Sequence, residues 1–436
     1  MDSRNHCPPH GAGLCCGYNQ LVLPKLLARY FLQIGCLLLA TLLSPFAAAQ
    51  SAHGVSALMV MPFENRSKVA GADWLSEACS EVLLQRIASP SVYVISRDER
   101  VFAFDHAGVP VAVRPTRATT FRVAEQMSAD YVVLGSYEVT GSDFQASAQL
   151  LEVKGLRLHP EIHSSGSLAE FVQLQTGLAW QLLRQMPNPP QVTENQFVKS
   201  APVIRLDTFE NYVRGVVSTS RPQKIRYLKE ALRLNPGYAA AAFELGSAYY
   251  DGHEYEQAAV WLSKVPKEDP SSGEAIFLLG MSEYNRGNLD RAYTAFNALV
   301  TRLPLTEVYN NLGVVDARRG RRAAAVEYFS RAVTADPSDA DYRFNLALTL
   351  FKSGDNAGAS RQLREVLQLR PSDAEAKGLL DVMSRGMTAA TIAAPAGAGA
   401  SAPRIPIERI KRNYDEASYR QVEMQIKNMS QPGIPK

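Results

Sequence analysis

The 436-residue sequence is poor in cysteine and has almost no net charge. Its 46 lysines and arginines are nearly balanced by 43 aspartates and glutamates, which leaves a net charge of +3. A chain so close to neutral lacks the basic field that attracts phosphates, so we expect no nucleic-acid partner. Cys79 stands far from the other four cysteines, which all belong to the first 36 residues. We expect Cys79 to be a buried, inert thiol within a helix.

The sequence also lacks the motifs of common enzymes and cofactor sites. It contains no H-E-x-x-H, G-x-S-x-G, Walker or C-x-x-C pattern. His159 and His163 flank Glu161, but without a further ligand this spacing favours exposed histidines over a metal site. Neighbouring acids such as Asp98 and Glu99 are interpreted as solvated caps at the ends of elements. We therefore expect a binding protein rather than an enzyme, with no cofactor and no metal.

Residues 1–49 combine a basic flank with a long apolar run. Lys25 and Arg29 precede the run FLQIGCLLLATLLSPFAAA, which contains Pro45 and ends in small residues. This order of features is typical of a secretory signal that is cleaved before Gln50. The alternative is an uncleaved anchor, because about 20 apolar residues can span a bilayer. Either interpretation predicts an exported protein whose membrane contact is limited to an uncleaved leader.

The second half of the chain carries an internal repeat of 33 or 34 residues. Four columns of residues keep this period together. The columns are Pro236, Pro270, Pro304, Pro337 and Pro371; Leu245-Gly246, Leu279-Gly280, Leu312-Gly313 and Leu346-Ala347; Ala258, Ala292, Ala325 and Ala359; and Leu262, Phe296, Phe329 and Leu363. Helical apolar spacing in each half predicts a hairpin of two helices, in which the glycines face the alanine column at close approach. Hairpins of this kind are stabilised by stacking on one another.

Period and pattern resemble the tetratricopeptide repeat family. The resemblance covers residues 203–384, with about four clear repeats and a capping helix at residues 374–384. Residues 205–235 form a degenerate first repeat, because they lack the Leu-Gly pair. Glu283 and Asp316 replace apolar residues of sister repeats, so we expect looser packing there. The resemblance implies an all-α superhelical solenoid whose first helices line a concave groove.

The groove positions implied by this resemblance are mostly aromatic and aliphatic. By register, the candidate protein-binding residues are Phe243, Ser247, Tyr250, Phe277, Met281, Tyr284, Asn310, Val314, Phe344, Leu348 and Phe351. A family clamp for a terminal carboxylate needs several cations and asparagines on these rows, and only Asn310 is present. We therefore expect an apolar peptide or helix as the ligand. The alternative is that these side chains pack as core within their own hairpins.

Residues 55–187 alternate between strand and helix patterns, which predicts a small α+β domain. Strands are expected at residues 57–63, 92–96, 131–139 and 144–153, and helices at residues 74–88, 121–127 and 167–186. This region resembles the N-terminal domain of the TolB family through the phrases VMPFEN, VISR, ADYVVLGSY and AQL. The resemblance implies an assembly or sensory module of the periplasm or bacterial cell envelope. The whole chain is thus expected to have a mixed fold.

The C-terminal region changes composition twice. Residues 385–404 are rich in alanine, glycine and proline, which predicts a flexible linker. The following amphipathic tail, residues 405–436, carries two apolar stripes at helical spacing. We interpret residues 407–429 either as a docking helix or as a marginally ordered end.

These features favour an exported scaffold that binds another protein or peptide, with its own tail as one candidate ligand. Envelope assembly or a secretion-related complex is the expected setting. The alternative is a ligand-sensing protein, in which the N-terminal domain binds a small molecule and the solenoid relays its state. A closed pocket in the N-terminal domain would favour the sensor, and a long open groove would favour the scaffold.

Overall fold

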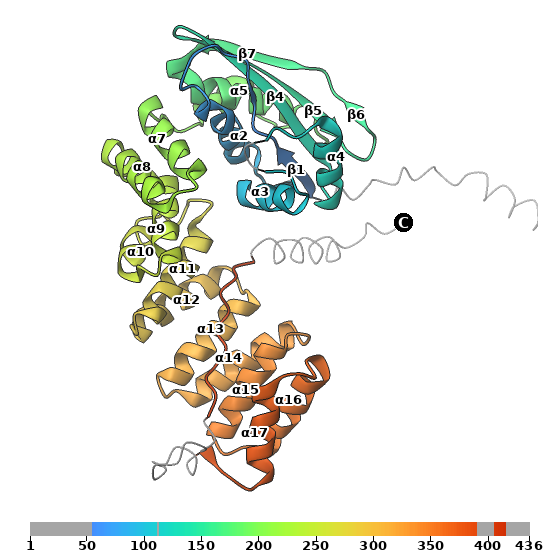
Figure 1. Ribbon diagram of the computed structural model, residues 1–436. Coiled ribbons are helices and arrows are strands. Elements are labelled where there is room, and N and C mark those ends of the chain that lie inside the picture. Colours follow the sequence, from blue (N-terminus) through green and yellow to red (C-terminus); the bar gives the residue numbers. More distant parts are fainter. Residues whose placement is uncertain (1–54, 111–112, 390–404, 416–436) are drawn as a thin grey trace, which may run out of the picture. The chain divides into compact units, whose positions relative to one another are not determined.

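A computed structural model describes residues 55–110, 113–389 and 405–415, which form a sheet domain and a stack of helical hairpins (Figure 1). The leader, most of the linker and the tail beyond residue 415 lie outside these described residues. Among the described helices, none has both the length and the apolar character that a membrane span requires.

Within the described residues, the N-terminal domain has one mixed sheet of seven strands. The strands are β1 (Ser56–Val60), β2 (Glu64–Asn65), β3 (Val92–Val94), β4 (Tyr131–Thr140), β5 (Asp143–Glu152), β6 (Arg157–Leu158) and β7 (Ile162–Ser167). Their order is β3-β1-β4-β5-β6, with β2 beside β4 and β7 beside β5. β1 pairs in parallel with β3 and β4, whereas β4 and β5 form the expected antiparallel hairpin.

Helices cover both faces of this sheet. They are α2 (Trp74–Ile87), α3 (Arg97–His106), α4 (Arg117–Gln126) and α5 (Phe171–Leu183), which is preceded by the short 3-10 helix η1 (Leu168–Glu170). The short helix α6 (Glu194–Lys199) packs against α5. Side chains alternate along β1, so Leu58 packs with α2 and α5 while Met59 packs with α3 and α4. A strand buried on both faces explains why its sequence is continuously apolar.

Two local features of this domain were open to sequence analysis. Cys79 is fully buried in α2, as expected, and burial raises the pKa of its thiol. Helix α3 was missed, although Ser96 and Glu99 form a capping box at its start. The S-x-x-E spacing is a known helix-start signal. Asp98 and Glu99 therefore lie in the first turn of α3, and Glu99 caps this helix, as expected.

The remaining helices form antiparallel hairpins in chain order, followed by a single capping helix. They are α7 (Leu206–Val217), α8 (Arg221–Leu234), α9 (Ala239–Asp251), α10 (Tyr255–Leu262), α11 (Ser272–Asn285), α12 (Leu289–Arg302), α13 (Thr306–Arg318), α14 (Arg322–Ala335), α15 (Ala340–Lys352), α16 (Asn356–Leu369) and α17 (Ala374–Ser384). Each odd-numbered helix from α7 to α15 packs against its successor. The proline column lies in the connections between hairpins, where it cannot interrupt a helix.

Glycines allow the two helices of a hairpin to approach, but their neighbours differ from the expected ones. A Cβ atom added to Gly313 would lie 2.6 Å from the ring of Phe329, and Gly246 stands in the same relation to Leu262. The large apolar column, rather than the alanine column, therefore covers the glycines. Gly215 is covered by Leu228 in the same way, so the first repeat is a complete hairpin whose glycine lies nearer the turn.

The two acidic replacements in the middle repeats are buried and paired. The carboxylate of Glu283 accepts hydrogen bonds from Arg286 at 3.0 Å and from Asn288 at 2.7 Å. Asp316 accepts one from Arg319 at 3.0 Å. Ion pairs and hydrogen bonds accommodate these acids within the stack, and the looser packing expected there stays a prediction.

Substitution of two glycines by alanine is expected to have opposite effects on stability. Gly313→Ala forces the ring of Phe329 to move and should lower the free energy of unfolding by about 1–3 kcal/mol. Gly378, on the open side of α17, has no heavy atom within 4 Å of an added Cβ. Gly378→Ala should therefore stabilise the chain by roughly 0.5–1 kcal/mol. Chemical denaturation measures both changes, and a destabilising Gly378→Ala would contradict the expectation.

Candidate functional site

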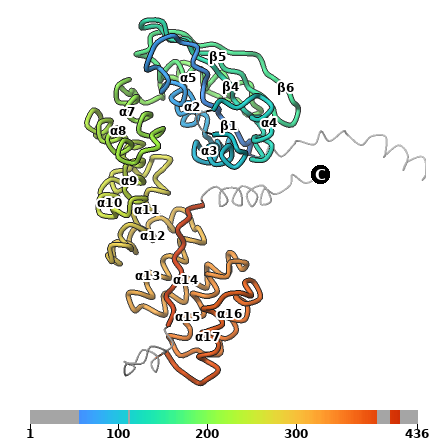
Figure 2. The backbone as a smooth tube through the Cα atoms, viewed as in Figure 1, coloured from blue at the N-terminus to red at the C-terminus, as the bar shows by residue number. Residues whose placement is uncertain are grey.

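Residues 405–415, named here the tail segment, lie along the first helices of the later hairpins (Figure 2). The tail segment contains no helix, so the docking helix expected from residue 407 onward is wrong for residues 407–415. Residues 416–429 lie outside the described part of the chain. Pro406 disfavours helix at its start, and side chains of the solenoid take the backbone groups that a helix would pair internally.

Two asparagines each hold one residue of the tail segment by its backbone. The Asn345 amide donates to the Arg409 carbonyl and accepts from the Arg409 N–H, both at 2.7 Å. Asn311 does the same with Lys411, with both distances at 2.8 Å. The amides thus reproduce the two-point pairing that a neighbouring β-strand would provide.

A third asparagine supports this arrangement. The Asn310 amide group donates to the Arg409 carbonyl at 3.0 Å, and its oxygen accepts from Asn345 at 2.8 Å. All three asparagines are fully buried in the presence of the tail segment. Because buried amides need hydrogen-bond partners, this set of three, the asparagine clamp, favours an extended polypeptide with free backbone groups.

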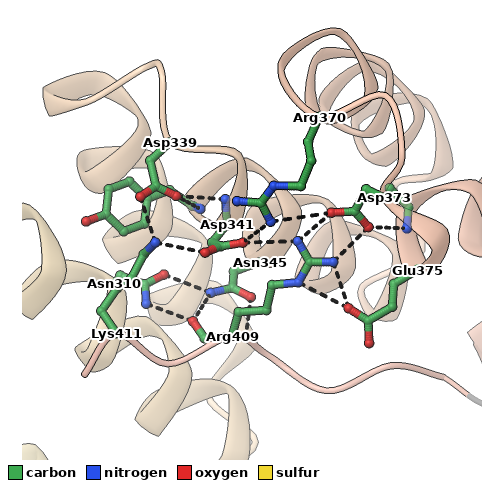
Figure 3. A network of polar contacts seen from close by, with 11 residues as sticks. Asn310, Asp339, Asp341, Asn345, Arg370, Asp373, Glu375, Arg409 and Lys411 are labelled. Carbon is green, nitrogen blue, oxygen red and sulfur yellow. Dashed lines mark hydrogen bonds and ion pairs between the residues drawn. The ribbon is translucent and has the colours of Figure 1, made fainter. Parts of the chain in front are cut away.

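The Arg409 side chain enters a cluster of acids at the starts of α15 and α17 (Figure 3). Its guanidinium donates two hydrogen bonds of 2.8 Å to Asp373, one on each oxygen. It also contacts Glu375 at 2.7 Å and Asp341 at 3.1 Å. The guanidinium carbon lies 3.6 Å from the centre of the Phe344 ring, which adds a cation–π contact.

Lys411 reaches the same cluster from two residues further along. Its ammonium nitrogen lies 2.7 Å from Asp339 and 2.8 Å from Asp341, and 5.0 Å from the centre of the Tyr342 ring. Asp339, Asp341, Asp373 and Glu375 together are named here the acidic cluster. Asp339 and Asp373 also cap α15 and α17 through backbone N–H groups. A helix cap therefore fixes these carboxylates before any ligand arrives.

The docked cations affect the ionisation of the acidic cluster. Burial opposes ionisation of Asp341, but hydrogen bonds from Lys411 and Arg370 outweigh it and lower its pKa to about 2. The hydrogen bond from Arg409 holds the pKa of Asp373 below its ordinary value. Both acids therefore stay charged at neutral pH and attract the tail segment.

Apolar and end contacts extend the interface beyond the clamp. Ile410 and Tyr414 join the apolar cluster that contains Phe277 and Met281, with the Tyr414 and Phe277 rings 5.5 Å apart. At the far end, the Asp415 N–H donates to Glu307 at 2.9 Å. Burial raises the pKa of Glu307. The solenoid thus contacts the tail segment both between the two clamped residues and beyond them.

The candidate groove residues divide into two groups. Phe243, Ser247 and Tyr250 are half-buried, whereas the buried ones are Phe277, Met281, Tyr284, Asn310, Val314, Phe344, Leu348 and Phe351. Asn310, Phe344 and Phe277 contact the tail segment directly. Their role in binding another protein stays a prediction.

Sequence analysis missed Asn311, Asn345 and the acidic cluster. The expected register placed Asn310 and Phe344 on the inner row and ignored the residue after each. The sequence PSDA, which precedes both α15 and α17, was a usable signal. This repeated sequence places an aspartate at the start of each of two successive first helices, so their carboxylates lie at the same edge of the groove.

Comparison with known proteins is consistent with this architecture. Models of the tetratricopeptide repeat match residues 225–279, 277–340 and 317–381. The solenoid is built of tetratricopeptide repeats. The chain is similar to a BBSome complex member BBS4 homolog of Drosophila melanogaster, 25% identical over 183 residues, which are 40% of this chain and 37% of that protein.

Two proteins described as TPR proteins match a similar share of the chain. A TPR repeat-containing protein of Methanocaldococcus jannaschii is 25% identical over 148 residues, 34% of this chain and 26% of that protein. The match thus spans little more than a third of the first curated relative and about a quarter of the second. The crystal structure of YrrB, described as a TPR protein with an unusual peptide-binding site, is 19% identical with a TM-score of 0.38. The match covers 40% of this chain and 92% of YrrB.

A cleft of about 950 Å³ is lined by residues of the N-terminal domain, several arginines among them, and by residues of α7, α8 and the turn between these helices. Arg100 donates to Glu77 at 2.5 Å and also to the carbonyl of Val60. Arg114 forms an ion pair with Glu64. Acids within the cleft therefore already neutralise much of its positive charge.

Proposed function

We propose that this chain is a protein-interaction scaffold that binds a partner as an extended segment in its solenoid groove. In this proposal the tail segment occupies the groove until a partner displaces it. The asparagine clamp carries the proposal, because Asn311 and Asn345 each use both amide atoms on one backbone residue. A helical ligand has already paired these backbone groups internally and could not satisfy the clamp. Of the two ligands expected from the sequence, an apolar peptide or a helix, the proposal therefore keeps the peptide, in an extended form.

Tethering strengthens the self-contact. The tail segment follows α17 after a short connection, so its effective concentration at the groove is on the order of millimolar. A partner must compete with that concentration. The tail segment thereby sets a threshold affinity for binding.

Hydrogen exchange on the full chain tests the self-contact. We expect slow exchange of the Arg409 and Lys411 amides, and fast exchange in a tail-release variant carrying Arg409→Ser and Lys411→Ser. A labelled peptide of residues 405–415 should bind the tail-release variant at low micromolar concentration and the unaltered chain at least tenfold more weakly. Fast exchange in the unaltered chain and no peptide binding at high micromolar concentration would overturn the proposal. Concentration-dependent dimers of the unaltered chain would instead assign the tail segment to a second copy.

Low pH is expected to weaken binding of the labelled peptide. Asp341 and Asp373 have pKa values below the ordinary range, so their charged forms favour docking. This contribution is complete above about pH 5, where a free carboxylate is almost fully ionised, and is lost as the pH falls toward about 2. Fluorescence anisotropy of the labelled peptide between pH 7 and pH 3 measures the loss. Constant affinity in a folded chain would contradict it, and Asp373→Asn should flatten the profile.

We further propose that the chain is exported into the cell envelope, with a TolB-like N-terminal domain as a second contact surface. The basic flank, apolar run and small residues before Gln50 support export. Cell fractionation with N-terminal sequencing should find a mature chain that begins near Gln50. An intact leader in the cytosol would disprove export, whereas an intact leader in membranes would support the anchor.

Ligand sensing by the N-terminal domain remains the second candidate function, and its cleft is the observation that favours it. If the cleft binds a small anion, that anion should raise the melting temperature of the chain. Arg114→Ala, which removes a lining cation, should abolish the shift. A screen of small anions that leaves the melting temperature unchanged would remove this alternative.

A further inference from the structure

We propose that the groove selects partners with an internal basic–apolar–basic tripeptide, with arginine first and lysine third. The inference rests on the proposed function and adds the chemistry of the partner. Its template is Arg409-Ile410-Lys411 of the tail segment, which the asparagine clamp holds by the backbone of the first and third residues.

The acidic cluster requires two cations. Arg370 lies 2.8 Å from Asp341 and 3.7 Å from Asp373, so this arginine compensates one of the four negative charges of the acidic cluster. Arg409 and Lys411 supply the remaining contacts, and both bind Asp341. If the tail segment leaves without a replacement, like charges repel one another across these helix ends. A partner with two correctly spaced cations relieves that repulsion, whereas a neutral or acidic segment does not.

The first position favours arginine over lysine. Asp373 accepts from both terminal nitrogens of Arg409, a two-point contact that needs a planar guanidinium. Phe344 covers one face of the same plane. An ammonium group would keep the charge but lose one of the paired bonds and the stacking.

The second basic position suits lysine. Asp339 and Asp341 each contact the single ammonium nitrogen of Lys411 at 2.7–2.8 Å. Between the two cations, Ile410 turns to the apolar cluster of the inner helices. Each of the three residues therefore meets a surface of matching chemistry.

The recognised tripeptide is internal to the ligand. Before it, Glu408 pairs with Lys352 at 2.7 Å, and after it the chain continues to Tyr414 against Phe277. Glu307 accepts the N–H of Asp415 at that end. An acid at this place disfavours a free terminal carboxylate, so we infer that partners present a loop or linker rather than a C-terminus.

A peptide series tests the inference on the full-length tail-release variant. The reference probe is the labelled peptide of residues 405–415, and the variants carry Arg409→Ala, Arg409→Lys, Lys411→Ala or Ile410→Ser. We expect affinity to fall at least thirtyfold for Arg409→Ala, and about tenfold for Arg409→Lys and for Lys411→Ala. Ile410→Ser should cost several-fold.

A matched change in the receptor separates specific recognition from general attraction to acid. In a tail-release variant that also carries Asp373→Asn, the preference for arginine over alanine should shrink to a few-fold. Asp381→Asn, an exposed acid on α17 outside the acidic cluster, should leave the preference intact. If all peptides bind within twofold of the reference, the inference is wrong while the proposed scaffold function stands. If the reference peptide itself fails to bind, the proposed function fails.

Discussion

Ala292→Arg should lower the free energy of unfolding of the solenoid by at least about 3 kcal/mol. Ala292 is fully buried on α12, in the layer where this helix packs against α11. Arginine cannot fit there without separating the helices, and its charge would lose water without gaining a partner. Thermal unfolding followed by circular dichroism should show a large fall in melting temperature.

The control for this variant is Arg321→Ala. Arg321 is exposed immediately before α14, so its removal should change stability by less than about 0.5 kcal/mol. Since neighbouring hairpins stabilise one another, damage at Ala292 should spread to adjacent repeats. Equal melting temperatures for the two variants would show that the repeat register is wrong.

Replacement of Asn311 and Asn345 by leucine should abolish docking of the tail segment while the solenoid stays folded. Leucine has a similar volume but cannot pair with the backbone of Arg409 and Lys411. Leaving each buried backbone group unpaired costs about 1–3 kcal/mol, so the double variant should bind the labelled peptide at least a hundredfold more weakly. Anisotropy in the tail-release background gives the affinity, and hydrogen exchange in the otherwise unaltered chain reports on the tail segment itself.

Asn297→Ala serves as the matched control, because Asn297 is exposed on α12. Its removal should leave both measurements unchanged. Retained protection of residues 409–411 in the leucine double variant would show that ion pairs alone hold the tail segment. The asparagine clamp would then lose its role in the proposed function.

The solenoid could be predicted because its packing repeats. In each hairpin the first helix must approach the second closely, with a small residue facing a large one. The pair Gly280 and Phe296 therefore recurs in the next hairpin as Gly313 and Phe329. Periodic columns therefore expose the core of a repeat protein in a single sequence. The first hairpin was identified only as a degenerate repeat, because its glycine, Gly215, lies at a different distance from the turn than the glycines of the later hairpins.

The binding site was less predictable because it depends on differences between repeats. Asn311 and Asn345 occupy positions that hold Glu244 and Leu278 in earlier hairpins, so no column marks them. A binding role for aspartates such as Asp373 was not predicted, because an aspartate at the start of a helix is already explained as a helix cap. The extended form of the tail segment was also hidden, because its apolar spacing is compatible with a helix until the solenoid competes for its backbone.

The asparagine clamp holds two residues of its ligand that are separated by one residue. Binding therefore depends on whether the number of residues between the two cations is odd or even. Side chains of an extended chain point alternately to opposite sides, so two cations separated by one residue share a side. Adjacent cations, or cations separated by two residues, would place one of them toward the apolar cluster around Phe277. Inserting a single residue within a partner's motif would therefore be more damaging than many substitutions, and inserting two would restore alternation while misplacing the second charge.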